Sequence, residues 1–353
     1  MDINAIFKAS TDLKASDIHL RVGLVPIIRT VGRLKRLEDF PVLTEEDALN
    51  ILDQLITDDQ RKTLLAEKEL DFSCDFGDVA RFRINVMWQR KTLSIACRVL
   101  PQIVPSIDEL ELPLICKDLI MQPRGLILIT GPTGVGKSTT MAAMIRHLNE
   151  NRDCNIICIE DPIEYQHPNI KAIVAQRELG EDTESFQSGL IRALRHDPDV
   201  IVVGEMRNLE TISAAITAAE TGHLVVSTLH TTDAVQTIDR MIDVFPPNQQ
   251  QQIRLQLSQE ILAILSQTLL PRANGKGMIA VFEIVMANPS IRNLIREGRT
   301  YEIPTYVKIH ADPNIQSLDE ALAVAVNTGV VTRQAAMRKA ADPKRLTNLL
   351  KGT

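Results

Sequence analysis

The residue types best suited to chemistry lie together at positions 131–138, in the run Gly-Pro-Thr-Gly-Val-Gly-Lys-Ser. This run matches the phosphate-binding P-loop pattern without a mismatch, and it stands between a β-type run and a helical one, as that motif requires. Glycine backbones let N–H groups curl around phosphate oxygens, and the following helix adds the positive end of its dipole. We therefore predict a nucleotide site formed by Gly131, Thr133, Gly134, Val135, Gly136, Lys137, Ser138 and Thr139.

Two side chains of this run suggest ATP and Mg²⁺ as ligands. The ammonium of Lys137 would contact the β- and γ-phosphates, and the hydroxyl of Ser138 would ligate the metal. The alternative is a glycine-rich turn that binds nothing, but its place between a strand and a helix favours the nucleotide site.

Carboxylates follow two further β-type runs, in Glu160-Asp161-Pro162-Ile163-Glu164 and in Val200-Ile-Val-Val-Gly204-Glu205. Phosphoryl transfer needs one group in the metal shell and another that orients water. The second run is like a Walker B motif with glycine in the usual place of aspartate, so Glu205 would act on Mg²⁺ through water. Glu164 follows the strand after the P-loop helix, where RecA-like ATPases carry their water-activating glutamate. We favour Glu164 as the base and Glu205 for the metal; the reverse assignment and a loop-capping role for both are the alternatives.

Two histidines bracket the next β-type run, Leu224–Thr228. His223 follows Gly222, which is suited to the position after a helix C-terminus. His230 stands at the strand end that should face the P-loop, where an imidazole can donate a hydrogen bond to the γ-phosphate. We predict a nucleotide contact for His223 and a catalytic role for His230; a purely structural role for each is the alternative.

The elements around these residues predict an α/β domain over 114–353. Apolar β-type runs alternate with helical ones, which is typical of a largely parallel sheet covered on both faces. After Thr232 we predict mostly helix (about 233–353), with one strand at Met278–Val285. The expected strands are 126–130, 156–160, 170–175, 200–204 and 224–228, and the expected helices begin at Ser138 or span 185–196 and 209–221.

Residues 1–100 predict a separate, small α+β domain, joined through a proline-containing linker at 101–113. Its second helical segment, 44–67, should bury Leu49, Leu52, Leu55, Leu64 and Leu65. Its other expected elements are a helix over 2–13 and strands over 17–22, 27–31, 70–76, 80–88 and 92–99.

Composition limits the class of protein. The chain has 353 residues, of which 44% are hydrophobic and 24% charged, which is an ordinary globular balance for about two domains. Its net charge of −6 argues against a nucleic-acid binder. The five cysteines lack C-x-x-C spacing, so we predict free thiols in a reducing compartment. We see no signal peptide and no apolar run of about 20 residues, and we expect a cytoplasmic protein without direct membrane insertion.

Taken together, the motifs resemble those of the secretion ATPases of the type II and type IV pilus superfamily, in the same order. These motifs are the P-loop, the acidic box 160–164, the Gly-Glu pair 204–205 and the histidine box 223–230. Three more stretches resemble the pilus retraction branch of that family: Ala15–Leu20, Leu269–Gly277 and Ser290–Glu297.

The resemblance implies a PAS-like first domain, a RecA-like second domain and a homohexameric ring that hydrolyses ATP to power pilus retraction and twitching motility. It implies an inner-membrane platform protein as partner, a paralogous pilus ATPase as a further one, and a place at the inner-membrane base of the pilus machine. It also implies that arginines of the first domain reach toward phosphate. Arg81, Arg83 and Arg98 match that region, and the alternation of a strand puts Arg81 and Arg83 on one face.

One stretch departs from the family pattern. His310–Asp319 stands where the family has a Gly-Met-Gln-Thr-like run, and only its Gln-x-x-Asp part is kept. This leaves open whether the chain is the principal motor or a divergent, accessory ring subunit. Pilus extension or type II secretion is a further alternative, although those relatives commonly carry a four-cysteine zinc element. A DNA translocase is the fourth.

Overall fold

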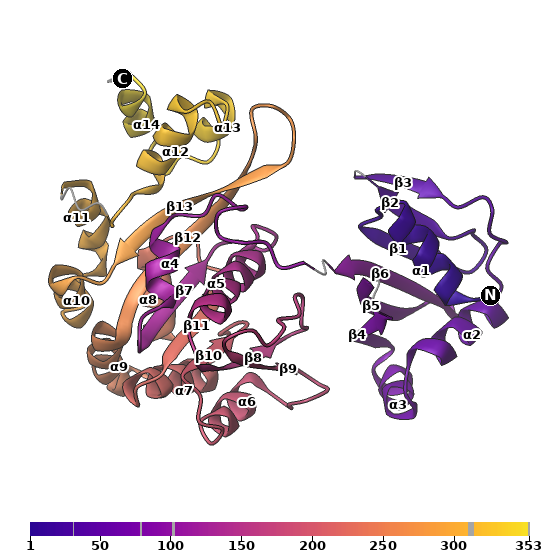
Figure 1. Cartoon of the computed structure of the whole chain (residues 1–353). Coiled ribbons are helices and arrows are strands. Elements are labelled where there is room, and N and C mark those ends of the chain that lie inside the picture. Colours follow the sequence, from indigo (N-terminus) through magenta and orange to yellow (C-terminus); the bar gives the residue numbers. More distant parts are fainter. Residues whose placement is uncertain (31, 78–79, 101–102, 310–313, 352–353) are drawn as a thin grey trace. The chain divides into compact units, whose positions relative to one another are not determined.

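The computed structural model describes residues 1–30, 32–77, 80–100, 103–309 and 314–351 (Figure 1). The chain divides into two compact units, Met1–Ile103 with Pro162–Gln166, and Val104–Asp161 with His167–Thr353. Part of the expected linker, 101–102, lies outside the described residues. The rest of it from Val104 onward belongs to the second unit, because Ile107 and Leu112 are buried in the core of that unit.

The first unit is a six-stranded antiparallel sheet with helices on one face. The strand order is β3-β2-β1-β6-β5-β4. Residues at every second position of β5, Ala80, Phe82, Ile84 and Val86, are buried against the helices, and Phe82 stacks on Phe7 of α1 with ring centroids 3.9 Å apart. The elements are α1 Ile3–Asp12, β1 Asp17–Arg21, β2 Ile27–Thr30, β3 Arg33–Arg36, α2 Glu45–Leu55, α3 Asp58–Glu67, β4 Glu69–Phe76, β5 Ala80–Gln89 and β6 Thr92–Leu100.

The helix predicted over 44–67 is two helices. Thr44 and Thr57 each begin a capping box, with Asp47 and Gln60 as the reciprocal partners, so the chain restarts a helix at Thr57. Leu52 and Leu64 are buried as expected, Leu55 is partly buried, and Leu49 and Leu65 are 45% and 54% exposed. The buried positions of α2 are Ala48, Ile51 and Leu52, so Leu49 lies off its buried face; α3 starts a new helical phase after Thr57 that buries Leu64 and not Leu65. Strand β3, whose residues are all exposed, was not predicted.

The second unit is a seven-stranded sheet in the order β13-β12-β7-β11-β10-β8-β9. Six strands run parallel, and β13 is antiparallel to β12. Alternate residues of the central strands belong to two different apolar cores, one with α7, α8 and α9 and the other with α4 and α5. Both faces of the sheet are therefore covered, and the α/β prediction is confirmed.

The first six strands of this unit are β7 Gly125–Thr130, β8 Asn155–Glu160, β9 Ile173–Glu178, β10 Val200–Val203, β11 Leu224–Leu229 and β12 Ile261–Pro271, followed by β13 Met278–Met286. Its helices before β12 are α4 Ile115–Ile120, α5 Lys137–Asn151, α6 Phe186–Ala193, α7 Leu209–Glu220, α8 Ala234–Asp243 and α9 Pro247–Glu260. After β13 come α10 Pro289–Arg296, the 3₁₀ turn Thr300–Glu302, α11 Ile303–Ile309, α12 Leu318–Asn327, α13 Arg333–Met337 and α14 Pro343–Leu349.

Two secondary-structure predictions in this unit differ from the structure, one in the type of element and one in its bounds. Strand β12 falls in the region expected to be helical, because a mostly buried and mostly apolar run shows no period that separates strand from helix. The strand expected at 170–175 begins three residues later, at Ile173, because the Ile170 N–H donates to the side chain of Asn149 instead. Of the divergent stretch 310–319, residues 310–313 lie outside the described part of the chain.

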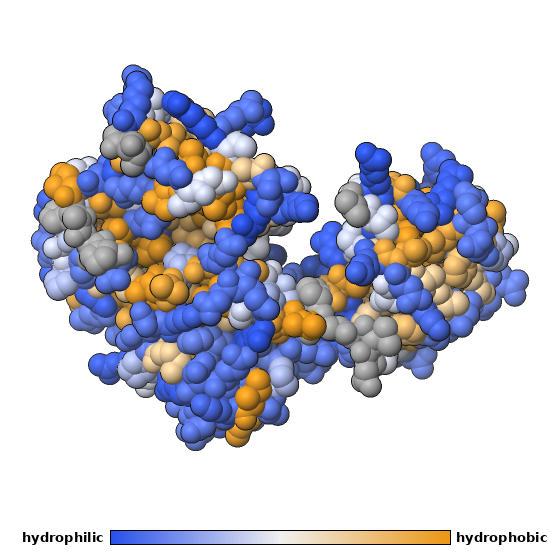
Figure 2. All heavy atoms as spheres, turned by 45° about the horizontal axis from the view of Figure 1, so that its top comes forward, coloured by the Kyte–Doolittle hydropathy of each residue, from blue (hydrophilic) through white to orange (hydrophobic). Residues whose placement is uncertain are grey.

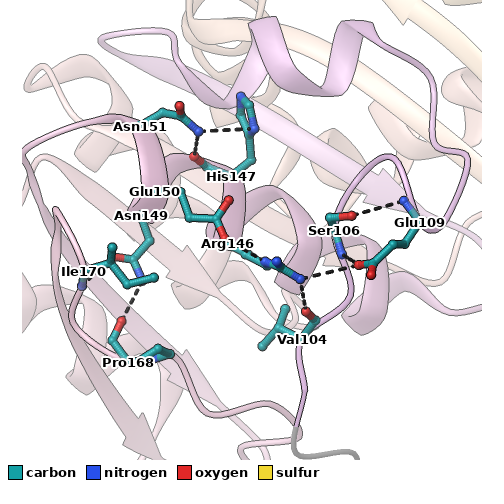
Figure 3. A network of polar contacts seen from close by, with 10 residues as sticks. All are labelled: Val104, Ser106, Glu109, Arg146, His147, Asn149, Glu150, Asn151, Pro168 and Ile170. Atoms are coloured by element: carbon teal, nitrogen blue, oxygen red, sulfur yellow. Dashed lines mark hydrogen bonds and ion pairs between the residues drawn. The ribbon is translucent and has the colours of Figure 1, made fainter.

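The P-loop helix α5 holds two loop segments of the second unit (Figure 3). Arg146 donates to the carbonyl of Val104 over 2.6 Å and pairs with Glu150 over 2.8 Å. Three residues on, the buried amide of Asn149 donates to the carbonyl of Pro168 over 2.6 Å. Val104 and Pro168 stand just after the two points where the chain passes from the first unit into the second. One helix therefore fixes both returning segments.

The described residues contain no helix that is both long enough and apolar enough to cross a membrane. On the face shown in Figure 2, apolar residues form scattered patches among hydrophilic ones. All five cysteines are free.

Candidate active site

The P-loop joins the carboxyl end of β7 to the start of α5, on the side of the sheet where all the parallel strands have their carboxyl ends. Gly134 and Gly136 have φ of +81° and +91°, in the left-handed region that favours glycine. Lys137 is buried, and its ammonium donates to the carbonyls of Gly131 over 2.8 Å and Pro132 over 3.2 Å. The side chain of Lys137 therefore folds back over the P-loop. Its ammonium lies over the loop that is expected to bind the phosphates.

The neighbouring strand β12 sets the glycine requirement at Gly131. A Cβ there would lie 2.5 Å from the carbonyl oxygen of Gln267 and 2.9 Å from the Val135 side chain. Gly136 is also close, with 3.2 Å from its ideal Cβ to Nε2 of Gln267. The close packing against β12 therefore favours glycine at both positions, whatever their contact with phosphate.

His230 bridges the P-loop and the carboxylate of Glu205. Its Nδ1 lies 3.3 Å from the Thr133 hydroxyl, and its Nε2 lies 3.3 Å from Oε1 of Glu205. A neutral imidazole that carries its proton on Nε2 would satisfy both contacts, accepting from Thr133 and donating to Glu205. The structure therefore brings together three predicted site residues that come from three different loops.

Glu205 also forms an ion pair with Arg207, whose Nη2 donates to Oε2 over 2.8 Å. Burial alone would raise the pKa of Glu205, but the hydrogen bonds from Arg207 and His230 outweigh it and hold the pKa below its usual range. Glu205 is therefore ionised at neutral pH, as a residue that acts on a metal shell must be.

The glycine at the usual aspartate position has a packing reason. A Cβ at Gly204 would lie 3.3 Å from the carbonyl oxygen of Ile159 and 3.4 Å from Cα of Glu160. The Gly204 carbonyl also accepts from the Thr228 hydroxyl over 2.6 Å. Strands β8 and β11 therefore hold the start of the Glu205 loop closely, and a larger residue at position 204 would require its neighbours to shift by a few tenths of an ångström.

The two histidines do not lie together. His223 precedes β11, and its Nδ1 lies 2.9 Å from the Ala218 carbonyl, whereas His230 follows the same strand. The six strand residues between them span roughly 20 Å. Gly222 has φ +106° after the α7 C-cap, as expected. His223 therefore lies at the amino end of β11, away from the P-loop, and its predicted nucleotide contact stays a prediction.

Glu164 lies on the segment Pro162–Gln166, which is grouped with the first unit. The base of this loop belongs to the second unit and is held by Gln176 of β9. The Gln176 amide donates to Glu160 over 2.9 Å and accepts from the His167 N–H over 2.9 Å. The role of Glu164 stays a prediction.

The three arginines lie on the sheet face of the first unit that faces away from its helices. Arg81 and Arg83 share that face, and Arg98 stands opposite Arg83 on β6. Each has an aspartate partner: Arg81 with Asp75 over 2.9 Å, Arg83 with Asp71 over 2.7 Å and Arg98 with Asp17 over 3.0 Å. Their contact with phosphate stays a prediction.

One residue that the sequence analysis missed is Gln267. It is 3% exposed, and its amide contacts both the P-loop and α5. The signal was weak, because a single glutamine in an apolar run carries no motif.

A glycine-rich strand-to-helix loop with a buried lysine, beside a carboxylate at the carboxyl edge of a parallel sheet, defines a P-loop nucleotide-binding domain. The profile of the type II/IV secretion system protein family matches residues 2–337 of the chain.

Individual relatives narrow this further. The type IV pilus retractation ATPase PilT of Pseudomonas aeruginosa is 43% identical over 344 residues, which are 98% of this chain and 99% of that protein. The type IV pilus ATPase PilU of the same organism is 35% identical over 351 residues, 99% of this chain and 92% of PilU. A crystal structure of the pilus retraction motor PilT with bound ADP superposes with a TM-score of 0.92 at 44% identity and covers 99% of each chain.

The chain belongs to the type II/IV secretion system protein family and is an ATPase of the PilT type. The predicted family and the predicted enzyme class are confirmed.

Proposed function

We propose that this protein is a hexameric motor that hydrolyses ATP to drive type IV pilus retraction. The observation that carries the chemistry is the chain of contacts from Thr133 of the P-loop through His230 to Glu205. The 43% identity to a retraction ATPase over 98% of this chain supports pilus retraction as the cellular function.

The P-loop residues would bind and orient the triphosphate. Lys137 would exchange the carbonyls of Gly131 and Pro132 for phosphate oxygens, which leaves its buried charge compensated throughout. His230 would hold the side chains of Thr133 and Glu205 in place relative to each other. On nucleotide binding it would turn its Nε2–H from Glu205 to the γ-phosphate.

The residues fit a magnesium ion that is held mainly by the nucleotide. Among the described residues, no cluster of three or more His, Cys, Asp or Glu could hold a metal. Mg²⁺ bound to phosphates needs only one or two protein ligands and keeps several waters. Ser138 at the start of α5 would be one ligand, and the ionised Glu205 would act through water. When bound, the ion neutralises charge on the phosphates.

The remaining parts of the proposal rest on the family. Glu164 would orient the attacking water, and Arg81, Arg83 and Arg98 would stabilise charge in the transition state. The motor would work in the cytoplasm at the base of the pilus machine and pass its motion to an inner-membrane platform protein.

An accessory ring subunit is the second candidate, favoured by the divergent stretch 310–319. The higher identity to PilT than to PilU, 43% against 35%, supports the principal motor.

The test is steady-state ATP hydrolysis by the purified full chain, with oligomer mass measured on the same samples. Turnover by a hexamer that is lost in Glu164→Gln and in Glu205→Gln would support the motor. A well-folded ring that binds ATP without turnover would instead identify an accessory subunit. Restoration of twitching in a strain lacking its own retraction ATPase, with Lys137→Ala as the control, then tests the cellular task.

A further inference from the structure

Gln267 lies in the middle of β12, in parallel register beside the start of the P-loop. Ser266 and Thr130 are the last paired residues of the parallel strands β12 and β7. The next residues beyond this pair, Gln267 and Gly131, therefore lie side by side. Its side chain is buried, and a buried amide must find hydrogen-bond partners. Both hydrogen bonds of its side chain go to the P-loop and its helix.

The two bonds hold different parts of that element. Nε2 donates to the carbonyl of Val135 over 2.6 Å, and Oε1 accepts from the Thr140 hydroxyl on α5 over 2.8 Å. Thr140 is itself 1% exposed. One amide therefore links the loop to the first turn of its helix from the side of β12.

The bond to Val135 sets the direction of a peptide group. In a trans peptide the C=O and the following N–H point in opposite directions. Because Gln267 holds the Val135 carbonyl on the β12 side, the Gly136 N–H is turned away from β12. P-loops bind phosphate with such N–H groups.

The lysine bonds in the loop are of another kind. Lys137 occupies the carbonyls of Gly131 and Pro132, and a bound phosphate would attract its ammonium away from them. The neutral amide of Gln267 has no comparable attraction to phosphate, so its bond to Val135 can persist with nucleotide bound.

We propose that Gln267 is a positioning residue that presets the P-loop backbone for phosphate, an inference that rests on the proposed nucleotide site. It acts through Val135 and Thr140 and does not itself touch the nucleotide. Pre-organisation of this kind raises affinity, since less ordering is required on binding.

The experiment measures binding of a fluorescent ADP analogue with Mg²⁺ to the full chain. Gln267→Leu leaves the Val135 carbonyl and the Thr140 hydroxyl without this partner, and we expect about tenfold weaker binding. Ser266→Ala is the matched control. It removes a buried hydroxyl from the adjacent position of the same strand, where the contact is with Thr130 over 3.0 Å, and it should keep the affinity within about twofold.

Gln267→Glu gives a test that a purely structural role would not pass. At pH 8 a carboxylate would oppose the Val135 carbonyl, whereas a protonated carboxyl can donate to it. Relative to the wild-type protein at each pH, we expect the affinity of this variant to recover as the pH falls from 8 to 6.

Equal loss of affinity in Gln267→Leu and Ser266→Ala, or wild-type affinity in both Gln267 variants, would overturn the inference. Should Gln267→Leu not fold, the pH response of Gln267→Glu and a loss of affinity in Thr140→Val decide the question. If the wild-type chain itself fails to bind the analogue, the proposed nucleotide site is wrong, which is a separate outcome.

Discussion

The two units handle their charged groups in different ways. On the open sheet face of the first unit, aspartates and arginines of adjacent strands pair with each other side by side, as Asp71 does with Arg83. In the second unit, carboxylates near the site are enclosed and also take hydrogen bonds from a backbone N–H or a histidine. Glu283 of β13 accepts from the Ala234 N–H at the start of α8 over 2.9 Å, and Glu205 contacts His230 in addition to its ion pair with Arg207.

This difference has energetic consequences. Exposed ion pairs contribute at most about 1 kcal/mol each, because water and salt screen them. Enclosed carboxylates carry desolvation costs that shift their pKa and couple the site to protonation. We infer that the arginines on the face of the first unit can exchange their aspartate partners for another anion, whereas the enclosed Glu283 of the second unit keeps its backbone partner.

The largest effect should come from the P-loop. Lys137→Ala removes the charge that is expected to contact the phosphates, and we expect ATP turnover to fall by about a hundredfold or more. Lys276→Ala, at an exposed turn, is the control and should retain full turnover. Steady-state phosphate release measures both. Retained turnover in Lys137→Ala would remove the P-loop from the mechanism.

The next effect concerns Glu283. Burial, together with the nearby Asp233 and Asp319, raises the pKa of Glu283 from 4.5 to about 7, against the lowering effect of the Ala234 N–H. Between those two values the folded chain holds a proton that the unfolded chain releases. The free energy of unfolding should therefore fall as the pH rises from 4.5 to 7, by roughly 1–3 kcal/mol.

Glu283→Gln should flatten this slope and stabilise the second unit above pH 7. Calorimetric unfolding at pH 5, 6, 7 and 8 would measure it. An unchanged slope in the variant would show that Glu283 is ionised throughout, as the paired carboxylates of the first unit are expected to be.

The sequence predicted the strands and loops of the nucleotide site well, because each buried strand there ends in a motif with its own chemistry. It failed where the signal depends on packing. Gln267 and β12 lie in a mostly apolar run that carries no motif. Only the structure shows that β12 packs directly against the P-loop at Gly131. Leu65 was placed in the core because the second capping box, at Thr57, was not taken into account.

The site residues also divide into those that were predicted from the ends of strands and those that were predicted from other signals. His230 and Glu205 were predicted from strand ends and do meet, since the carboxyl ends of parallel strands share one edge. His223 was predicted from its place beside the same strand, but the strand separates it from His230 by roughly 20 Å, so its nucleotide contact stays a prediction. The arginines came from the family resemblance; in this chain they pair with aspartates of their own sheet, and their contact with phosphate stays a prediction.

A smaller effect is expected for those arginines. Arg83→Ala and Arg98→Ala should each lower turnover of the assembled protein about tenfold, with ADP affinity and stability nearly unchanged. Arg33→Ala on the exposed strand β3 is the matched control. Turnover equal to wild type in both variants would assign the two arginines to the charge pairs of their own sheet.

The smallest effect tests those charge pairs directly. Asp17 lies 3.0 Å from Arg98 and 3.7 Å from Arg29. Burial alone would raise the pKa of Asp17, but hydrogen bonds from Ser16 and Arg98 outweigh it and lower the pKa below 3.8. The stabilisation is therefore present above about pH 3.8 and is lost as the pH falls through the folded value. We expect Asp17→Asn to cost at most about 1 kcal/mol at pH 7 and less near pH 3.

The single tryptophan, Trp88, lies on β5, so its fluorescence during urea unfolding reports on the first unit alone. A cost well above 2 kcal/mol, or one that is the same at pH 3 and pH 7, would mean that Asp17 acts as an enclosed structural carboxylate. The sheet face of the first unit would then resemble the second unit, and its arginines would be poorly suited to exchange their partners for phosphate. A small cost that 0.5 M salt removes would instead leave those arginines free to change partners within one nucleotide cycle.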